Sequence, residues 1–494
     1  MLGPPTLPTA FSAADASQTF NAVLPGAWVA PGLKVQISYT PQGAEPLLMT
    51  RPVSVGDPTN LDLVLVPIRI GSSTGVIPSS PFAVRDLIAM SFPYAHASID
   101  VSVRAALTIS GLENLSVAGD VGRVLAEIEA ARVLENPRAV YYGFVADAVM
   151  QARMASGRRL IGVAHVNDLA APSYMWHLSA LGTDSMLSLG VQDSFGLPWT
   201  WWARIMVHEL GHVHGRHHAP CGDAGGTDPN FPYTNGALGA QPIYASSYSD
   251  ATLGAIGAPT ILGTGASMKD VMGYCEGVWF SDYNYYHVQR FAETYAAATG
   301  IAADGASATS AVQAEKPFLI LSGQIDSSGL TLRPAFLSGA PIADANTPDT
   351  GYDVVIWTAD GRELTQRVIA HASSEIADSA SFRVSVPAGS RVTRVQFSRN
   401  GTAISPGVMN ETFPIESGTV SWKREPAGLS VKWNAAAEPY LSVIRVTKAG
   451  KRTALRLFAR GGELYLPAEE FAGAGIELQA GTTLNARRIR AIAP

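Results

Sequence analysis

The chain has 494 residues and a formal net charge of −6, and 47% of its residues are hydrophobic while 15% are charged. This length exceeds what one hydrophobic core usually serves, so we expect about two to four domains. The composition is that of a globular protein and excludes a largely disordered chain. Because no dense run of Lys or Arg occurs, the sequence also lacks the electrostatic footprint of a nucleic-acid-binding protein.

The first 20 residues, MLGPPTLPTAFSAADASQTF, contain neither the basic nor the apolar region of a signal peptide, so we predict none in this sequence. The longest uncharged, apolar-looking stretch, residues 251–267, is rich in Gly and contains Pro259. It is too short for a membrane span and reads as a loop. We therefore expect no membrane-spanning segment.

The predicted elements begin with strands over residues 21–110, within an N-terminal β-rich segment (1–58) and the start of a second unit. Residues 33–39 and 99–109 alternate apolar and polar side chains, and residues 61–70 form a continuous apolar run typical of a buried strand.

A helix is predicted over residues 120–134, because Val121, Leu125 and Ile128 form one apolar stripe, with Asp120 as N-cap and Pro137 beyond its end. Residues 158–166 read as another strand. A second helix should begin near Pro198 and run to His214. This order of elements predicts an α+β domain over residues 59–300.

Small and polar residues at 301–316 predict a linker, and nearly everything beyond it reads as strands. Hairpin turns are expected at Asp360-Gly361, at Asn400-Gly401 and around Gly450. We predict two β-sandwich-like modules, at 317–408 and 409–494. One larger β domain is the alternative.

Five of the ten histidines lie within VHELGHVHGRHHAP, residues 207–220. His208 and His212 are four residues apart, so on a helix they project from one face and can bind the same ion. Gly215 can adopt a positive φ, end the helix and return the chain, which brings His218 to that ion.

Three neutral imidazoles leave one position of a tetrahedral zinc ion open, as in catalytic rather than structural sites. Zinc lowers the pKa of a bound water towards ~7, and Glu209 can take its proton as general base. The alternative is an HExxH that occurs by chance in a helix, which the added glycine and third histidine disfavour. The neighbouring His214 and His217 fit no ligand position, so we expect them beside the site or facing solvent.

The pattern HExxHxxGxxH, formed by His208, Glu209, His212, Gly215 and His218, resembles that of the metzincin clan of zinc endopeptidases. The resemblance implies an α+β metzincin-like catalytic domain, with a twisted sheet plus a long zinc-binding helix, followed here by C-terminal all-β sandwich-like modules. It also implies one catalytic Zn²⁺ ion.

The clan has a methionine turn beneath the zinc, and KDVMGYC (269–275) is similar to it and places Met272 there. In some branches a tyrosine two residues further contacts the metal or the oxyanion. Tyr274 stands in that position, and a packed aromatic is its alternative role. The segments HAPCG, DPNFPY, DVMGYC and WFSDYNYYH together resemble the secreted bacterial StcE-type mucin-cleaving metalloproteases, which does not establish mucin as the substrate.

Three further features have a structural and a functional interpretation. Asp223 and Asp228, in a Gly-rich loop, favour turn formation over Ca²⁺ binding. The tryptophans 199, 201 and 202 favour helix packing over a substrate platform. The resemblance suggests that residues 162–166 form an edge strand that pairs with an extended peptide substrate.

Both cysteines, Cys221 and Cys275, lie downstream of the histidine helix, which excludes latency through an upstream thiol on the zinc. An exported protein with two cysteines normally pairs them. One follows the third zinc ligand and the other follows Met272, so the expected site brings them together. We predict a disulfide; two free thiols, or Cys221 as an extra zinc ligand, are the alternatives.

Together these features predict a secreted or cell-surface zinc endopeptidase that hydrolyses extracellular proteins or glycoproteins. The C-terminal modules would position it by binding glycans or surfaces, and truncation after about Ala314 should leave a folded protease. The alternative is a surface adhesin or carbohydrate-binding protein with a non-catalytic metzincin-like domain. The intact glutamate and histidines of the motif disfavour it.

Overall fold

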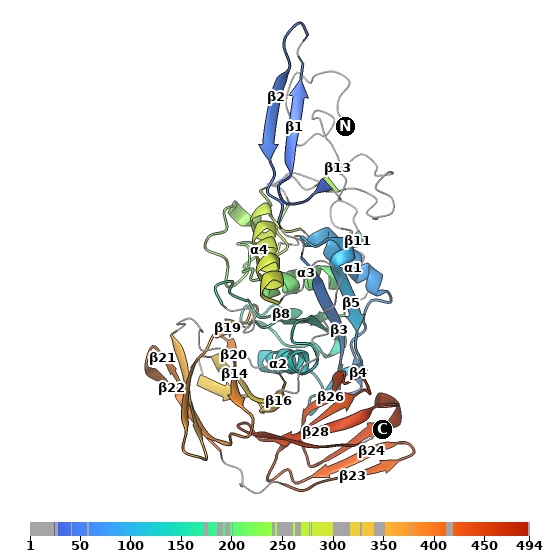
Figure 1. The fold of residues 1–494 in the computed structure, drawn as a ribbon, viewed down its shortest axis with the longest axis vertical. Helices are drawn as coiled ribbons and strands as arrows, with labels where there is room; N and C mark the ends of the chain where they lie inside the picture. Colours follow the sequence, from blue (N-terminus) through green and yellow to red (C-terminus); the bar gives the residue numbers. More distant parts are fainter. Residues whose placement is uncertain are drawn as a thin grey trace.

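The computed structural model describes residues 28–40, 42–56, 59–171, 176–184, 201–239, 268–275, 279–299, 317–326, 329–339, 351–376, 378–411 and 418–492, with positions 24, 191–192, 198–199, 243–244, 260–261 and 277. Within these residues the protein is a mixed α/β chain with four α-helices and many more strands (Figure 1). The predicted linker 301–316 lies outside the described residues, as does the predicted loop 251–267 apart from positions 260–261.

The centre of the molecule is part of an 11-stranded sheet. Its axis is β3 (Leu61–Ile70), which coincides with the predicted buried strand. β7 pairs with one edge of β3, and β5 and then β6 pair with the other, all in parallel. β9 follows β7 in parallel, and β8 closes this side of the sheet in the antiparallel direction. The bounds are Ile99–Val103 (β5), Leu107–Ile109 (β6), Val140–Val145 (β7), Gly162–Ala164 (β8) and Ser179–Thr183 (β9).

Helices cover both faces of this sheet. Because successive strand residues point to opposite faces, β3 sends Leu63 and Leu65 to one core and Val64 and Val66 to the other. The first core is shared with α1 (Pro81–Ser91), α3 (Trp201–Val213) and α4 (Asp282–Thr299). The second core is shared with α2 (Ala118–Glu135), so α2 lies on the opposite face from α3 (Figure 1).

Two helices depart from the predicted elements. Residues 81–91, expected among strands, form α1, where the Ser80 hydroxyl accepts a hydrogen bond from Phe82 N and Pro81 occupies the first turn. Residues 99–109, predicted as one strand, instead form two strands, β5 and β6. The 18-residue helix α4 was not predicted.

The predicted helix starts also need correction. Asp120 is not the N-cap of α2 but lies in its first turn, where its carboxylate accepts hydrogen bonds from Val117 N (3.3 Å) and Ser116 N (3.2 Å). The histidine helix begins at Trp201 rather than near Pro198. Pro198–Trp199 instead form β11, which pairs with β10 (Val191–Gln192).

A two-stranded hairpin, β1 (Lys34–Tyr39) with β2 (Leu47–Pro52), projects from the body in Figure 1. β1 coincides with the predicted strand 33–39. Two further short strands, β12 (Ile243–Tyr244) and β13 (Thr260–Ile261), pair with each other, and β4 (Ser73–Thr74) pairs with β3.

The first C-terminal module consists of two antiparallel sheets around one core. The shared core includes Leu321, Val384, Val354 and Val395, with two residues from each sheet, which is a sandwich-like arrangement. One sheet contains β14 (Phe318–Asp326), β15 (Gly329–Leu332), β16 (Phe336–Ser338), β19 (His371–Ala372) and β20 (Ala380–Pro387). The other contains β17 (Tyr352–Thr358), β18 (Glu363–Arg367), β21 (Val392–Arg399) and β22 (Thr402–Asn410). β22 crosses the predicted boundary between residues 408 and 409.

The second module combines a three-stranded sheet with four strands that belong to the large central sheet. β26 (Arg452–Ala459) pairs in parallel with β6, through Arg456 with Thr108 and Leu457 with Ile109. The sheet therefore runs without interruption from the N-terminal half into the last module. The remaining strands are β23 (Val420–Glu425), β24 (Gly428–Trp433), β25 (Tyr440–Val446), β27 (Glu463–Pro467), β28 (Gly475–Gly481) and β29 (Ala486–Ile492).

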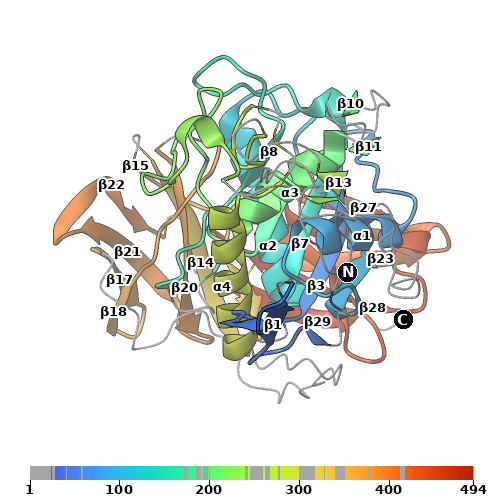
Figure 2. The ribbon, with the colours of Figure 1, turned by 90° about the horizontal axis from the view of Figure 1, so that it is seen from above.

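The hairpin turns of both modules lie where the sequence predicts them. Asp360-Gly361 joins β17 to β18, and Asn400-Gly401 joins β21 to β22 with φ of 48° and 75°. Gly450, with φ of 80°, lies between β25 and β26. In Figure 2 the first module lies on the left and the last module extends behind the helices towards the right, and the two are in contact where Leu337 N donates to Gln479 Oε1 at 2.9 Å.

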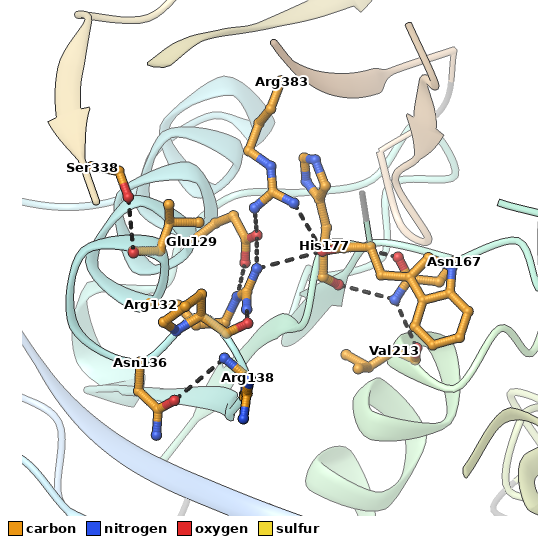
Figure 3. Close-up of polar contacts among 12 residues, drawn as sticks. Glu129, Arg132, Asn136, Arg138, Asn167, His177, Val213, Ser338 and Arg383 are labelled. Atoms are coloured by element: carbon orange, nitrogen blue, oxygen red, sulfur yellow. Dashed lines mark hydrogen bonds and ion pairs between the residues drawn. The ribbon is translucent and has the colours of Figure 1, made fainter. Parts of the chain in front are cut away.

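A buried ionic cluster fastens the first module to α2 (Figure 3). Glu129 receives two hydrogen bonds from Arg132, at 2.7 and 2.8 Å, and pairs on its other side with Arg383 of β20. Arg383 also donates to Trp176 O at 2.9 Å. Removing one partner of such a cluster leaves an uncompensated buried charge, so the cluster holds β20 and the adjoining β19 in a defined place on the central unit.

Candidate metal centre

Two of the candidate metal ligands, His208 and His212, lie on α3, whose apolar side packs on the sheet. Met206, Val207 and Leu210 belong to the core, and His208 and His212 are 9% and 0% exposed. Polar side chains this deeply buried need partners that replace water.

Gly215 ends the helix as predicted. Its φ is 77°, its N–H donates to His212 O at 2.8 Å, and a Cβ at this position would stand 2.7 Å from Asn167 O. The Asn167 side chain in turn donates to Val213 O at 2.8 Å, which fixes the end of the helix (Figure 3). The chain returns from there and places His218 beside the helix.

The hydrogen bonds of the three histidines determine their tautomers. Each Nδ1 lies against a backbone carbonyl oxygen, that of Val271 for His208, of Arg216 for His212 and of Gly225 for His218. A carbonyl oxygen only accepts, so each Nδ1 carries a proton, and in the neutral imidazole Nε2 is then the nitrogen with the lone pair that can bind a metal.

These three lone pairs converge. His212 Nε2 lies 3.1 Å from His208 Nε2 and 3.2 Å from His218 Nε2. Acceptor nitrogens this close repel one another unless they share a cation. A tetrahedral zinc ion with nitrogen ligands at about 2.0–2.1 Å would hold such atoms about 3.3 Å apart, so the three nitrogens fit a metal ion. Burial and the two neighbouring imidazoles hold the pKa of His212 well below its ordinary value, which keeps it in the neutral form that binds metals.

Met272 packs against this helix at Gly211. It is fully buried, and a Cβ on Gly211 would stand 2.4 Å from its sulfur, so only glycine fits between the two histidines at this point. The turn that carries Met272 is closed by the Gly273 N to Asp270 O hydrogen bond of 3.0 Å.

Asp270 organises this turn, and the sequence analysis did not single it out. Its buried carboxylate accepts from Met272 N and Ser281 N, both at 2.7 Å, and from Asn284 Nδ2 at 2.9 Å. Asn284 continues to Arg216, whose Nε lies 2.7 Å from Asn284 Oδ1. The turn, α4 and the loop after α3 are thus joined by one hydrogen-bonded chain.

The predicted disulfide is confirmed. Cys221 and Cys275 are joined, with their Cα atoms 5.6 Å apart. Next to the bond, Tyr274 N donates to Cys221 O at 2.9 Å and Ala219 N donates to Met272 O at 3.1 Å. The segment after His218 is therefore tied to the methionine turn by both covalent and hydrogen bonds.

A fourth ligating group, Glu375, comes from the first C-terminal module. Its Oε1 lies 2.9 Å from His218 Nε2, 3.4 Å from His208 Nε2 and 3.9 Å from His212 Nε2. Among the described residues these four side chains are the one group of three or more that can hold a metal ion. Nothing in the sequence around Glu375 indicates this role, because the contact spans 157 residues and depends on how the module is placed.

Tyr274 points into the same site. Its hydroxyl donates to Glu375 Oε2, and its ring lies 5.0 Å from the His218 ring, with the Arg158 guanidinium 4.8 Å from the centre of the tyrosine ring. Burial, followed by the neighbouring Glu375 carboxylate, raises the pKa of the Tyr274 hydroxyl, so this group remains a proton donor at neutral pH.

Glu209 faces the site from α3 and is 3% exposed. Among the described residues its Oε2 has no hydrogen-bond partner. Burial and the nearby Glu375 carboxylate raise the pKa of Glu209 well above its ordinary value. A cation held by the three histidines would act in the opposite direction, which is a second reason why these residues fit a metal ion.

Two cavities flank the histidines. One of about 140 Å³ is lined by Gly162, Trp201, Arg204, Glu209 and Tyr274 among others. A larger one of about 830 Å³ lies towards the first module and is lined by His218, Asp223 and Arg399 among others. Glu375 lines both cavities, although its side chain is only 6% exposed.

The remaining candidates divide between packing and the site. Trp202 is a core residue, whereas Trp201 lines the smaller cavity; of Trp199 the structure gives only its place in β11. Asp228 pairs with Arg216 at 2.7 Å and Asp223 is exposed, and neither belongs to the group of described residues that could hold a metal ion.

The other two histidines of the motif lie outside the metal-binding group. His214 is buried and bonds to Tyr94 Oη at 2.8 Å and to Leu210 O at 2.7 Å, whereas His217 is exposed.

The chain matches no protein-family model and no curated protein. Two solved structures similar to parts of it are a two-domain fibronectin type III segment of chicken tenascin and a β-1,2-glucanase from Parabacteroides distasonis. Each alignment covers 36% of this chain, with 12% and 13% identity and TM-scores of 0.15 and 0.14, and spans 100% and 28% of the other chain. Scores this low carry no argument about fold or function. In the described part of the chain, no helix has the length and apolarity that crossing a membrane requires.

Proposed function

We propose that the protein is a zinc-dependent endopeptidase of the metzincin type. The observation that carries this proposal is the convergence of three unprotonated Nε2 atoms beside an unpartnered glutamate oxygen, next to the edge strand β8. His208, His212 and His218 would hold the zinc. When bound, the ion supplies Lewis acidity for attack on a peptide carbonyl.

Residues of the chain would carry out the proton transfer and stabilise the oxyanion. Glu209 would accept the proton of the attacking water and pass it to the leaving amine. Tyr274 would donate a hydrogen bond to the developing oxyanion. Met272 would support the histidines from below without touching the substrate.

The fold around the histidines supports the metzincin assignment. A parallel sheet ends in the antiparallel strand β8, a helix carries the first two histidines, a glycine turns the chain to the third, and a buried methionine lies beneath. An extended substrate would add to the edge of β8, because backbone pairing aligns a peptide with little demand on its sequence.

The disulfide supports action outside the cell, since such bonds persist mainly in oxidising compartments. The substrate would then be an extracellular protein or glycoprotein. The first module lies within reach of the site through Glu375 and would influence which substrates enter. Binding of glycans or surfaces by the two modules is part of the same proposal.

The test is the variant Glu209→Gln, which keeps the size of the side chain but cannot accept a proton. Zinc content by mass spectrometry should stay near one ion per chain, while hydrolysis of unstructured casein should fall by at least ~10²-fold. The exposed pair Lys432–Glu463 offers a control, Glu463→Gln, which should leave both unchanged. If neither the wild-type protein nor the variant Glu375→Ala, which removes the carboxylate beside His218 Nε2, cleaves anything in a broad peptide library while binding zinc, a non-catalytic binding protein becomes the better assignment.

A further inference from the structure

The outer edge of the sheet at the C-terminal end of β8 is paired with another segment of the same chain. Ser374 N donates to Ala164 O and Val166 N donates to Ala372 O, each at 3.0 Å. His165 and Ser373 form an antiparallel bridge between them. Residues 372–374 therefore pair in the antiparallel direction with residues 164–166, which are the last residue of β8 and the two residues after it, and we name residues 372–375 the strap.

The strap ends in the metal centre. Glu375, its last residue, brings one carboxylate oxygen to within 2.9 Å of His218 Nε2, while the other accepts the Tyr274 hydroxyl. One side chain thus engages both the convergent nitrogens and the tyrosine proposed to stabilise the oxyanion. The carbonyl group of a bound substrate would need both the metal held by these nitrogens and the hydroxyl of the tyrosine.

The charges in the site are consistent with metal binding by Glu375. Glu375 Oε1 lies 2.9 Å from His218 Nε2 and 3.4 Å from His208 Nε2, and a carboxylate oxygen this close to imidazole lone pairs is unfavourable unless a cation lies between them. A divalent cation held there would have a closed set of three nitrogens and one oxygen. A closed set of four ligands is the form of a non-catalytic zinc site.

Apart from Ala372, the last residue of β19, the strap lies in the loop between β19 and β20 rather than in a strand. Residues 373–379 connect β19 to β20, and Ser373 N donates to Ser379 O at 2.8 Å across the base of this loop. β20 is held separately by eight residue pairs with β14 and by the Arg383–Glu129 contact. Lifting residues 373–376 would therefore leave the module in place.

We propose that the strap is an internal occupant of the peptide-binding edge, with Glu375 as an exchangeable fourth metal ligand, so that the enzyme is latent until the strap is displaced. This inference rests on the proposed protease function for its consequence. The same backbone groups of β8 and the same metal face cannot serve the strap and a substrate at once. The class of competitor is an extended peptide that adds to β8 in the antiparallel direction.

The test uses the full chain loaded with Co²⁺, whose visible absorption reports the coordination of the metal. Acetohydroxamate, a small metal chelator, is titrated into wild type, Glu375→Ala and the distant control Glu463→Ala. We expect the dissociation constant for acetohydroxamate to fall at least 10-fold in Glu375→Ala and to be unchanged in the control. On zinc-loaded protein, cleavage of a short peptide should rise at least 10-fold in the same variant.

A second variant, Ser374→Pro, keeps Glu375 but removes the N–H that pairs with Ala164 O. It should shift both readouts in the same direction, and it keeps the test decisive if Glu375→Ala does not fold. Equal acetohydroxamate affinity in wild type and the folded variants would overturn the strap proposal. Tighter acetohydroxamate binding without peptide cleavage would instead support Glu375 as the blocking ligand and count against the protease function.

Discussion

The carboxylate of Glu209 lies directly against Gly162 of the edge strand: a Cβ on Gly162 would stand 2.3 Å from Glu209 Oε1 and 2.8 Å from its Cγ. The proposed general base therefore occupies a space that exists only because β8 has no side chain at this position. The strand that would bind the substrate is therefore in close contact with the residue that would transfer the proton.

Replacing Gly162 by alanine should displace Glu209 while leaving the zinc ligands untouched. We expect kcat to fall at least 10-fold with zinc content unchanged, because misplacing a catalytic group by about 1 Å is costly. The control is Gly119→Ala in α2, where a Cβ meets nothing within 4 Å. A Gly162→Ala enzyme with normal kcat would show that Glu209 tolerates another position and would weaken its assignment as the base.

His212→Ala should remove the metal. His212 contributes the central Nε2, within 3.2 Å of both other nitrogens, so its loss leaves two histidines that no longer enclose an ion. Zinc retained after dialysis should fall below detection, and hydrolysis should fall with it. The matched control is His217→Ala, which changes an exposed histidine of the same segment. Full zinc occupancy in a His208/His212 double variant would contradict the site.

Truncation after residue 316 is now expected to destabilise the protein, contrary to the sequence-based expectation. The cut would remove β26 from beside β6. It would also remove Ala454, whose N–H donates to the carboxylate of Glu135 at 2.7 Å. It would also strip Arg383 from the buried Glu129. We expect an insoluble or unfolded product by circular dichroism, and a soluble, cooperatively melting fragment would show that the central unit folds alone.

Stability should fall on mild acidification because of His165. Burial lowers the pKa of His165 from 6.5 to about 4, so between these values the unfolded chain binds a proton that the folded protein does not. The free energy of unfolding should therefore decrease as the pH falls from about 6.5 to about 4, by up to about 3 kcal/mol for this group.

The measurement is urea unfolding of wild type and His165→Gln at pH 7.5 and 5.0. The variant should lose less stability than wild type between the two pH values. The pH dependence that comes from the candidate metal ligands is the same in both proteins and cancels in this comparison. Identical pH dependence in the two proteins would show that His165 is not the group responsible.

The grouping of the candidate metal-binding histidines and the disulfide could be predicted from the sequence because local chemistry determines them. The spacing of His208 and His212 on one helix, the positive φ that Gly215 permits and the pairing of two cysteines each depend on nearby residues or on the scarcity of a residue type. The hairpin turns of the modules were predicted for the same reason, since Asn-Gly and Asp-Gly favour those backbone conformations over short distances.

The tertiary structure alone decided what closes the site. Glu375 lies in a Ser-rich loop that looks unremarkable in sequence, and it meets His218 only because Arg383 and β20 hold the first module against α2. The pairing of β26 with β6, which joins the last module to the central sheet, is equally non-local. Contacts between residues hundreds of positions apart depend on how whole units pack, and no local periodicity or turn residue records that packing.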